Sequence, residues 1–533
     1  MSQLKQISLS LASALLLWAA WPAGGFAPLL FIALVPHLIT EDLIATGTGK
    51  SRFSFFRISW LSMLVFNLLT TWWIWFASPG GMILANITNS FIMAMFFHFF
   101  HLTKKKLGPI WGYASLFFYW TAYEFLHHRW DLSWTWLSFG NGFAAWCDMV
   151  QWYEYTGILG GTMWVLITNI VVAFFINKAI RLNRRVYIKP AVIYLFPLIL
   201  IPVVISGVLK GMRQEKRNPV VVTVVQPNID PYNEKFGGMS SRDQLKKMLS
   251  LAAQKTNDKT DYLVFPETAL PDGLWEEDIQ QNREIETVRD FMKPFPSLKV
   301  VMGLSSNRFY TTQEAPTSTA RAFKDGGGYF DSYNSGMQLS SDTAIQLHHK
   351  SKLVVGVEQV PFQGLFGFFE KFAIQLGGSS GSLGTQKIPS VFTGGKAAVA
   401  PVICYESVYG EYVTQYIKQG ANIIFILTND GWWHDTPGYR QHCQYARLRA
   451  IETRRAIARS ANTGISCFID QQGNITQPTK WWTPDVITET LQLNNELTFY
   501  VKHGDYIGRF ACGISLLFVI AAFLKKKNKI NIN

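Results

Sequence analysis

The sequence predicts a polytopic α-helical membrane region with about eight transmembrane helices and one α/β domain inserted outside the cytoplasm. Three observations predict this fold class. Charged residues make up only 16% of the 533 residues, well below their share in soluble globular proteins. Long runs contain no Asp, Glu, Lys or Arg, namely 6–40, 58–103, 107–123, 155–177, 190–209 and 510–524. Between residues 214 and 503 the pattern changes to short β-branched runs separated by helical stretches.

The charge-free runs divide into eight predicted spans, because a bilayer core requires about 20 apolar residues per helix. The first two runs are long enough for two helices each, and they break at Pro22-Ala23-Gly24-Gly25 and at Ser78-Pro79-Gly80-Gly81. The predicted spans cover about 6–22, 26–45, 55–77, 82–103, 107–127, 156–178, 189–209 and 508–524. The first span also fits a signal peptide, since Lys5 precedes an apolar stretch that ends at Trp21.

The basic residues set the predicted orientation. Residues 214–503 are balanced in charge, so the formal charge of +13 comes from the flanking membrane segments. The cations of the short loops fall on one side of the membrane when both termini are cytoplasmic, which puts residues 214–503 on the other side. Such a distribution is typical of membrane topology and argues against a nucleic-acid partner. The predicted divisions are a seven-helix membrane domain over 1–213, an extracytoplasmic domain over 214–503, and an eighth helix with a cytoplasmic tail over 504–533.

Apolar runs in the inserted domain predict strands that are buried on both faces, over 220–225, 262–265, 300–302, 397–404, 423–427 and 465–469. Helices are predicted between them, including 241–253 and the arginine-rich stretch 439–460. The arginines of that stretch are expected to form a solvated helix face. Strands interleaved with helices indicate a layered α/β domain.

Three polar residues follow or interrupt these apolar runs. Glu267 comes directly after a predicted strand. Lys350 lies in a polar segment between Leu347 and Leu353, and Cys404 ends a strand where the chain must turn. A nucleophile in a strand-end turn is exposed, and the next backbone N–H can face a developing oxyanion. Because a thiol needs a base or a positive field, Glu267 and Lys350 are predicted to activate Cys404. Taken singly, they also fit a buried thiol, a helix cap and a surface charge.

The other cysteines, Cys147, Cys443, Cys467 and Cys512, form no C-x-x-C pair, so no disulfide framework is predicted. The histidines at 348, 349, 434 and 442 lack metal-ligand spacing, and the chain has no Walker loop. The sequence therefore predicts neither a metal nor another cofactor.

The flanks of the three polar residues together resemble the nitrilase superfamily, whose Glu-Lys-Cys triad occurs in this chain order. The matching segments are Pro266-Glu267-Thr268-Ala269, His349-Lys350-Ser351-Lys352-Leu353 and Cys404-Tyr405-Glu406. With its membrane spans, the chain resembles the apolipoprotein N-acyltransferase family over essentially its full length. Further matches are Gln226-Pro227-Asn228, Tyr333-Asn334-Ser335, the segment 427–433 and the segment 134–140. Two positions depart: Lys352 stands where the superfamily usually has His, and Val355-Gly356-Val357 precedes Glu358 where this family more often has Pro-Phe-Gly.

The resemblance implies an αββα sandwich in the periplasm of a bacterium, anchored in the inner membrane. It implies a ping-pong reaction in which Cys404 takes an acyl chain from a phospholipid, typically phosphatidylethanolamine, as a thioester. The acyl chain is then transferred to the α-amine of diacylglyceryl-cysteine in an apolipoprotein, which is the last step of lipoprotein maturation. Glu267 would be the general base, and Lys350 with the Tyr405 backbone N–H would stabilise the oxyanion. Glu358, Tyr405 and Glu406 are implied as supporting residues.

One apolar, glycine-punctuated segment has two interpretations. Leu365, Phe366, Phe368 and Phe369 are candidates for a lid that dips into the membrane, and a core helix is the alternative.

Two other functions stay open at this point. The first is a membrane-tethered amidase of the same fold, which would release ammonia from short amides. The second is a non-catalytic receptor or transporter, in which the three polar residues would be independently replaceable.

Overall fold

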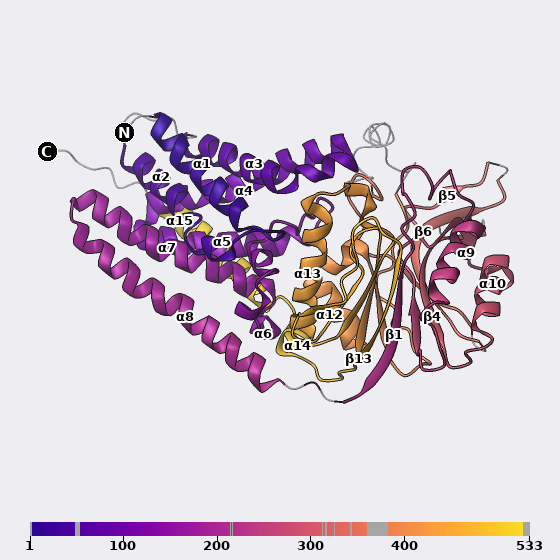
Figure 1. The fold of residues 1–533 in the computed structure, drawn as a ribbon. Helices are drawn as coiled ribbons and strands as arrows, with labels where there is room; N and C mark the ends of the chain where they lie inside the picture. The colour runs from indigo at the N-terminus through magenta and orange to yellow at the C-terminus, as the bar shows by residue number, and fades with distance from the viewer. Residues whose placement is uncertain are drawn as a thin grey trace. The chain divides into compact units, whose positions relative to one another are not determined.

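The structure is a computed structural model that describes residues 3–47, 54–213, 215, 217–311, 313–314, 317–324, 326–341, 344–359 and 382–525. The chain divides into two compact units, one helical and one built on β-sheets (Figure 1). The helical unit takes its residues from 1–72, 82–212 and 503–533. The second unit contains Arg213–Lys502 together with Trp73–Gly81, a segment from the distant N-terminal part of the chain.

Helices occupy every predicted span. They are α1 (Gln3–Ala20), α2 (Val35–Thr46), α3 (Ser54–Thr71), α4 (Pro79–Leu107), α5 (Pro109–His127), α7 (Ile158–Leu182), α8 (Ile188–Met212) and α15 (Tyr506–Leu524), and the short α6 (Tyr153–Thr156) precedes α7. Within the described part of the chain, six segments are long and apolar enough to cross a membrane: Ala27–Thr46, Ser54–Phe76, Pro79–Leu107, Ile158–Leu182, Arg185–Met212 and Tyr506–Leu524. Helices α1 and α5 are outside this set.

The predicted breaks between spans coincide with local stop and start signals. Gly24 has a φ of +114°, a conformation that glycine adopts without steric cost, and it follows the end of α1. At the second break, Ser78 Oγ accepts a hydrogen bond of 3.1 Å from the Gly81 backbone N–H. Pro79 is the first residue of α4, where its missing N–H costs no helical bond.

Charged residues buried in the helical unit pair with one another. Lys104 on α4 contacts Glu41 and lies 3.1 Å from Asp42 Oδ1 on α2, and the partly exposed Arg181 on α7 contacts Asp42 as well. His101 Nδ1 is 2.7 Å from Glu41 Oε1. Since buried charges are stable only when paired, this cluster fastens α2, α4 and α7 to one another.

Two stacked sheets form the second unit. Within the described residues, the first has eight strands: β1 (Pro219–Gln226), β2 (Tyr262–Val264), β3 (Leu270–Trp275), β4 (Lys299–Tyr310), β5 (Arg321–Ala322), β6 (Tyr329–Leu339), β7 (Gln346–His349) and β13 (Asp485–Gln492). Their order is β13-β1-β2-β4-β6-β5, with β3 beside β4 and β7 beside β6. The second sheet has the order β12-β11-β10-β9-β8 and consists of β8 (Val399–Ile403), β9 (Ile423–Thr428), β10 (Ile457–Ala461), β11 (Cys467–Ile469) and β12 (Ile475–Thr476).

The apolar core has two layers, one outside the first sheet and one between the sheets. Helices α9 (Ser241–Ala252) and α10 (Arg283–Met292) bury Met248 and Val288 against the first sheet. Val222 and Phe425 belong to the core between the two sheets. Helices α12 (Gly410–Lys418) and α13 (Pro437–Thr453) cover the other face of the second sheet (Figure 1). The layers therefore run helix, sheet, sheet, helix, and the prediction of a layered α/β domain is confirmed.

The prediction for residues 439–460 is wrong in two respects. Helix α13 ends at Thr453, because Arg454 has a left-handed φ of +50°, and residues from Ile457 form β10. Most of the arginines do not form a solvated face, since Arg449, Arg454, Arg455 and Arg459 are at most 2% exposed, whereas the Arg440 side chain is half-exposed. β10 pairs in parallel with β9 in the second sheet, which carries Arg459 into the interior.

Candidate active site

The predicted polar residues come from the ends of three strands. Glu267 follows β2, Lys350 follows β7 and Cys404 follows β8. Lys350 Nζ lies 3.1 Å from Glu267 Oε1 and 2.9 Å from Glu358 Oε1. On β6, Asn334 Nδ2 donates to the same two oxygens at 2.8 and 2.9 Å. The lysine, the two carboxylates and the amide therefore form one buried hydrogen-bonded cluster.

Glu358 is held in this cluster by a tight turn. Its Oε2 accepts a 2.8 Å hydrogen bond from the Val354 backbone N–H. Gly356 has a φ of +83°, and its N–H donates to the Gln359 carbonyl at 2.8 Å. Gly356 therefore supplies the left-handed residue that the turn requires. With the unusual sequence Val355-Gly356-Val357 before it, the Glu358 carboxylate still contacts Lys350.

Cys404 is the first residue of a 3₁₀ helix, Cys404–Val408, and has a left-handed φ of +48°. This conformation costs a non-glycine residue about 1–2 kcal/mol, so its neighbours must hold it. Ser407 Oγ donates to the Cys404 carbonyl at 2.7 Å. Tyr405, next in the helix, is 6% exposed and its ring packs edge-on against Tyr409.

The electrostatics of the cluster keep the thiol protonated. Burial raises the pKa of Cys404 well above its ordinary value, the Glu267 carboxylate adds to the rise, and the Lys350 ammonium opposes it. For Lys350, burial alone would lower the pKa, but the carboxylates of Glu267 and Glu358 raise it well above its ordinary value. The resting site is therefore a neutral thiol beside an ammonium group with two carboxylates.

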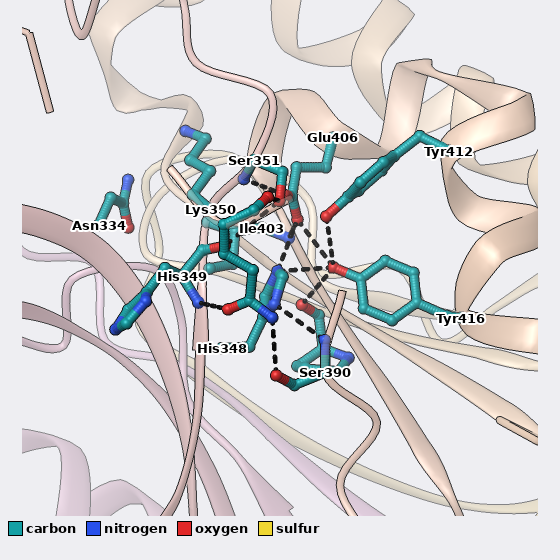
Figure 2. A network of polar contacts seen from close by, with 12 residues as sticks. Asn334, His348, His349, Lys350, Ser351, Ser390, Ile403, Glu406, Tyr412 and Tyr416 are labelled. Carbon is teal, nitrogen blue, oxygen red and sulfur yellow. Dashed lines mark hydrogen bonds and ion pairs between the residues drawn. The ribbon is translucent and has the colours of Figure 1, made fainter. Parts of the chain in front are cut away.

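The Glu406 carboxylate connects the turn that carries Cys404 to the segment after β7 that carries Lys350. Figure 2 shows its carboxylate surrounded by donors from both segments. One oxygen accepts from the Ile403 N–H at 2.9 Å and from Tyr416 OH at 3.2 Å, and the other accepts from the Ser351 N–H at 2.6 Å. His348 Nε2 lies 3.4 Å from Glu406 Oε2. Burial would raise the pKa of Glu406, but His348 and the backbone donors outweigh burial and hold it below its ordinary value.

The sequence did not predict a series of buried, hydrogen-bonded side chains that begins at the Cys404 carbonyl. His442 Nε2 lies 3.2 Å from the Cys404 carbonyl oxygen, and its Nδ1 lies 2.9 Å from Asp430 Oδ1. Arg459 Nη2 donates to Asp430 Oδ2 at 2.7 Å. Arg459 and His442 lower the pKa of Asp430 to about 2, against the opposing effect of burial. The only signal in the sequence was the polar Asp430 at the end of an apolar run.

Lys235 is a second residue that the sequence analysis missed. Its side chain is 2% exposed, and its Nζ donates to the Glu267 carbonyl oxygen at 2.8 Å. Burial lowers the pKa of Lys235 to about 8, although Glu267 counteracts the effect. This lysine therefore helps to fix the loop that carries Glu267.

Two other sequence expectations concern the surroundings of the site. The lid candidates Leu365, Phe366, Phe368 and Phe369 lie outside the described residues. In the part of the chain that the structure describes, no group of three or more His, Cys, Asp or Glu side chains forms a candidate metal site. His348 is instead engaged with Glu406, and His349 lies 2.7 Å from Glu276.

Comparisons with known proteins identify the family. Residues 13–171 match the family described as apolipoprotein N-acyltransferase N-terminal domain, and residues 221–496 match the carbon-nitrogen hydrolase family. An apolipoprotein N-acyltransferase from Chlorobaculum tepidum is 31% identical over 540 residues, which cover 98% of this chain and 97% of that protein. The chain belongs to the apolipoprotein N-acyltransferase family.

More distant apolipoprotein N-acyltransferases also match along most of their length. The protein from Geobacter metallireducens is 24% identical, and the match covers 98% of this chain and 95% of that protein. The protein from Haemophilus influenzae is 26% identical, with 96% and 92% covered. Membership of this family therefore extends over both units of the chain.

The series of buried side chains that begins at the Cys404 carbonyl predicts a large loss of stability in Asp430→Asn. The change leaves the Arg459 charge buried without a counter-charge, which should lower the free energy of unfolding by about 3–5 kcal/mol. Since the pKa of Asp430 is lowered to about 2, this stabilisation is complete above the ordinary value of about 4 and is lost as the pH falls towards 2. Thermal unfolding of the purified protein in detergent at neutral pH measures the effect.

Asp290→Asn is the matched control for this prediction. Asp290 pairs with Lys293 at 2.8 Å, but both side chains are largely exposed, so the change should cost no more than about 1 kcal/mol. Equal losses of stability in the two variants would contradict the assignment of a stabilising buried ion pair to Asp430 and Arg459.

Proposed function

We propose that the protein transfers an acyl chain from a phospholipid to the N-terminal α-amine of diacylglyceryl-cysteine in apolipoproteins. The observation that carries this proposal is the buried cluster of Glu267, Lys350 and Glu358 at the strand ends beside Cys404. The similarity to apolipoprotein N-acyltransferases over 98% of the chain supports this class of substrates. The apolar helices support a reaction between two lipids in a membrane.

In the first half-reaction, Cys404 Sγ attacks the ester carbonyl carbon of the donor, for which we propose phosphatidylethanolamine. Glu267 takes the thiol proton as the S–C bond forms. Both hydrogen bonds to its carboxylate fall on Oε1, and no side chain in the described ranges donates to Oε2, which leaves that oxygen to act as the base. The ester C–O bond then breaks, and the departing lysophospholipid oxygen takes the proton from Glu267.

Lys350 is proposed to stabilise the oxyanion of the tetrahedral intermediate. An ammonium group has three donors, and two of them are used by Glu267 and Glu358. The remaining N–H and the backbone N–H of Tyr405 would donate to the oxyanion. The high pKa of Lys350 keeps the group charged throughout the reaction, so it stabilises the oxyanion and is not itself an acid or base.

In the second half-reaction, the α-amine of the acceptor attacks the thioester carbonyl. Glu267 takes a proton from the amine, the C–S bond breaks, and the sulfur recovers a proton from Glu267. The product is an amide, which is more stable than the thioester, so the transfer needs no nucleotide. Glu406 and Glu358 are proposed as positioning residues that set Cys404 and Lys350 for both steps.

Cys404→Ala should abolish formation of the acyl-enzyme. The test is intact-mass analysis after incubation with phosphatidylethanolamine, in which wild type should gain one acyl chain that hydroxylamine removes. Cys147→Ala, Cys443→Ala, Cys467→Ala and Cys512→Ala are the controls, and each should still be acylated. An acyl adduct on the Cys404→Ala protein would refute covalent catalysis at this position, and ammonia release from short amides by wild type would favour a membrane-tethered amidase instead.

Glu358→Gln should slow both half-reactions by roughly ten- to a hundredfold without unfolding the protein. The reason is the loss of one charge-assisted hydrogen bond to Lys350, worth about 1.5–3 kcal/mol. Rates of acyl-enzyme formation and of transfer to a diacylglyceryl peptide measure the effect. Exposed Glu314→Gln serves as the control, and unchanged rates in the Glu358 variant would make that residue peripheral.

We also propose that residues 1–213 span the membrane seven times, that residues 214–503 lie in the periplasm and that residues 504–533 supply an eighth span with a cytoplasmic end. The loop cations support this arrangement. A reporter fused after residue 300 should behave as extracytoplasmic, and one fused after Lys529 as cytoplasmic. Finding both reporters on one side would exclude the eight-span arrangement.

A further inference from the structure

The helical unit contains a large apolar groove between α5, α7 and α8. Its volume is about 1050 Å³, just above the range of about 300–1,000 Å³ that is usual for ligand pockets. The lining side chains are almost all aliphatic or aromatic and include Ala114, Phe118, Ile170, Phe174, Phe175 and Tyr194. The groove therefore has the size and the chemistry to hold hydrocarbon chains.

Specific contacts between α7 and α8 define the groove. Pro202 has no N–H, so the carbonyl of Leu198 one turn earlier lacks its helical donor. Trp164 Nε1 on α7 donates to that carbonyl at 2.7 Å. One turn nearer the start of α8, the Tyr194 ring stacks on the Phe175 ring of α7, with the ring centroids 5.5 Å apart. The two helices are thus joined at two levels, with the groove lined by residues of both.

Basic residues gather where α7 ends and α8 begins, next to one end of the groove. Lys178 Nζ lies 4.6 Å from the centre of the Tyr187 ring, one turn beyond Phe175 on α7. Arg181 is already paired with Asp42. Arg184, Arg185 and Lys189 are exposed, and no carboxylate of the residues described by the structure forms an ion pair with them. These three cations lie in the part of the chain between the groove residues Phe175 on α7 and Tyr194 on α8.

We propose that this groove binds one anionic phospholipid, with its acyl chains along α5, α7 and α8 and its phosphate beside Arg184, Arg185 and Lys189. A basic pocket between transmembrane helices is the kind of site that binds anionic headgroups, and the orientation proposed above puts this one at the cytoplasmic surface. The N-terminus of the 25-residue α8 adds the positive end of a helix dipole at Ile188. The site belongs to the helical unit and is distinct from the cluster around Cys404.

The test measures binding of defined lipids to the full chain in a Cys404→Ala background, so that any lipid adduct is non-covalent. The protein is delipidated in detergent and incubated with phosphatidylglycerol or with phosphatidylethanolamine of the same acyl chains, and native mass spectrometry counts the lipids bound. Phosphatidylglycerol should bind as a single high-affinity adduct. Removal of Arg184 and Arg185 together, as Gln, should weaken it by about fivefold for each cation.

Two further variants keep the proposal falsifiable. Arg57→Gln removes an exposed cation at the start of α3 and should leave the affinity unchanged. Ala114→Trp fills the groove and should reduce binding of phosphatidylglycerol, with thermal unfolding used to verify that the variant is folded. Equal affinity for the two headgroups, or an unchanged affinity in the Arg184 and Arg185 double variant, would overturn the proposal. The outcome is independent of the acyltransferase reaction, because Cys404 is absent throughout.

Discussion

The carboxylate of Glu406 connects the two sheets at the point where the candidate active site is assembled. It accepts from the backbone of Ile403, at the end of β8, and from the backbone of Ser351, just after β7. Because Cys404 and Lys350 are the chain neighbours of these two residues, one buried carboxylate fixes the distance between a thiol on one sheet and an ammonium group on the other. The two backbone N–H groups and the Tyr416 hydroxyl that donate to it satisfy a charge that would otherwise be costly in the interior.

Burial and the charges around Lys350 together set the protonation state of the Cys404 thiol. Burial opposes ionisation of the Cys404 thiol most strongly, and the Glu267 carboxylate adds to this effect while the Lys350 ammonium counteracts it. A site of this kind does not store a reactive thiolate between turnovers. In the mechanism proposed above, the thiol gives up its proton to Glu267 only as the S–C bond forms.

Sequence patterns predicted the parts of the site that lie at strand ends. Glu267 and Cys404 each end an apolar run, and runs of this kind define the edge of a buried sheet. The position of Glu358 followed only from a family resemblance, since its side chain reaches Lys350 through a local turn. The buried Arg459 could not be predicted, because its partner Asp430 lies 29 residues away and an arginine-rich stretch has the composition of an exposed helix. Helix α13 likewise looked longer than it is, as the left-handed Arg454 that ends it carries no glycine signal.

The left-handed backbone of Cys404 is a source of strain that the rest of the fold must offset. A cysteine at a φ of +48° is held there by Ser407 and His442, and glycine would adopt the same conformation without strain. Glycine would relieve this strain, but it would also remove a buried side chain and add conformational freedom to the unfolded chain. The fold therefore holds its strained residue at the strand end that also carries the thiol, and strained residues of this kind cluster at functional sites.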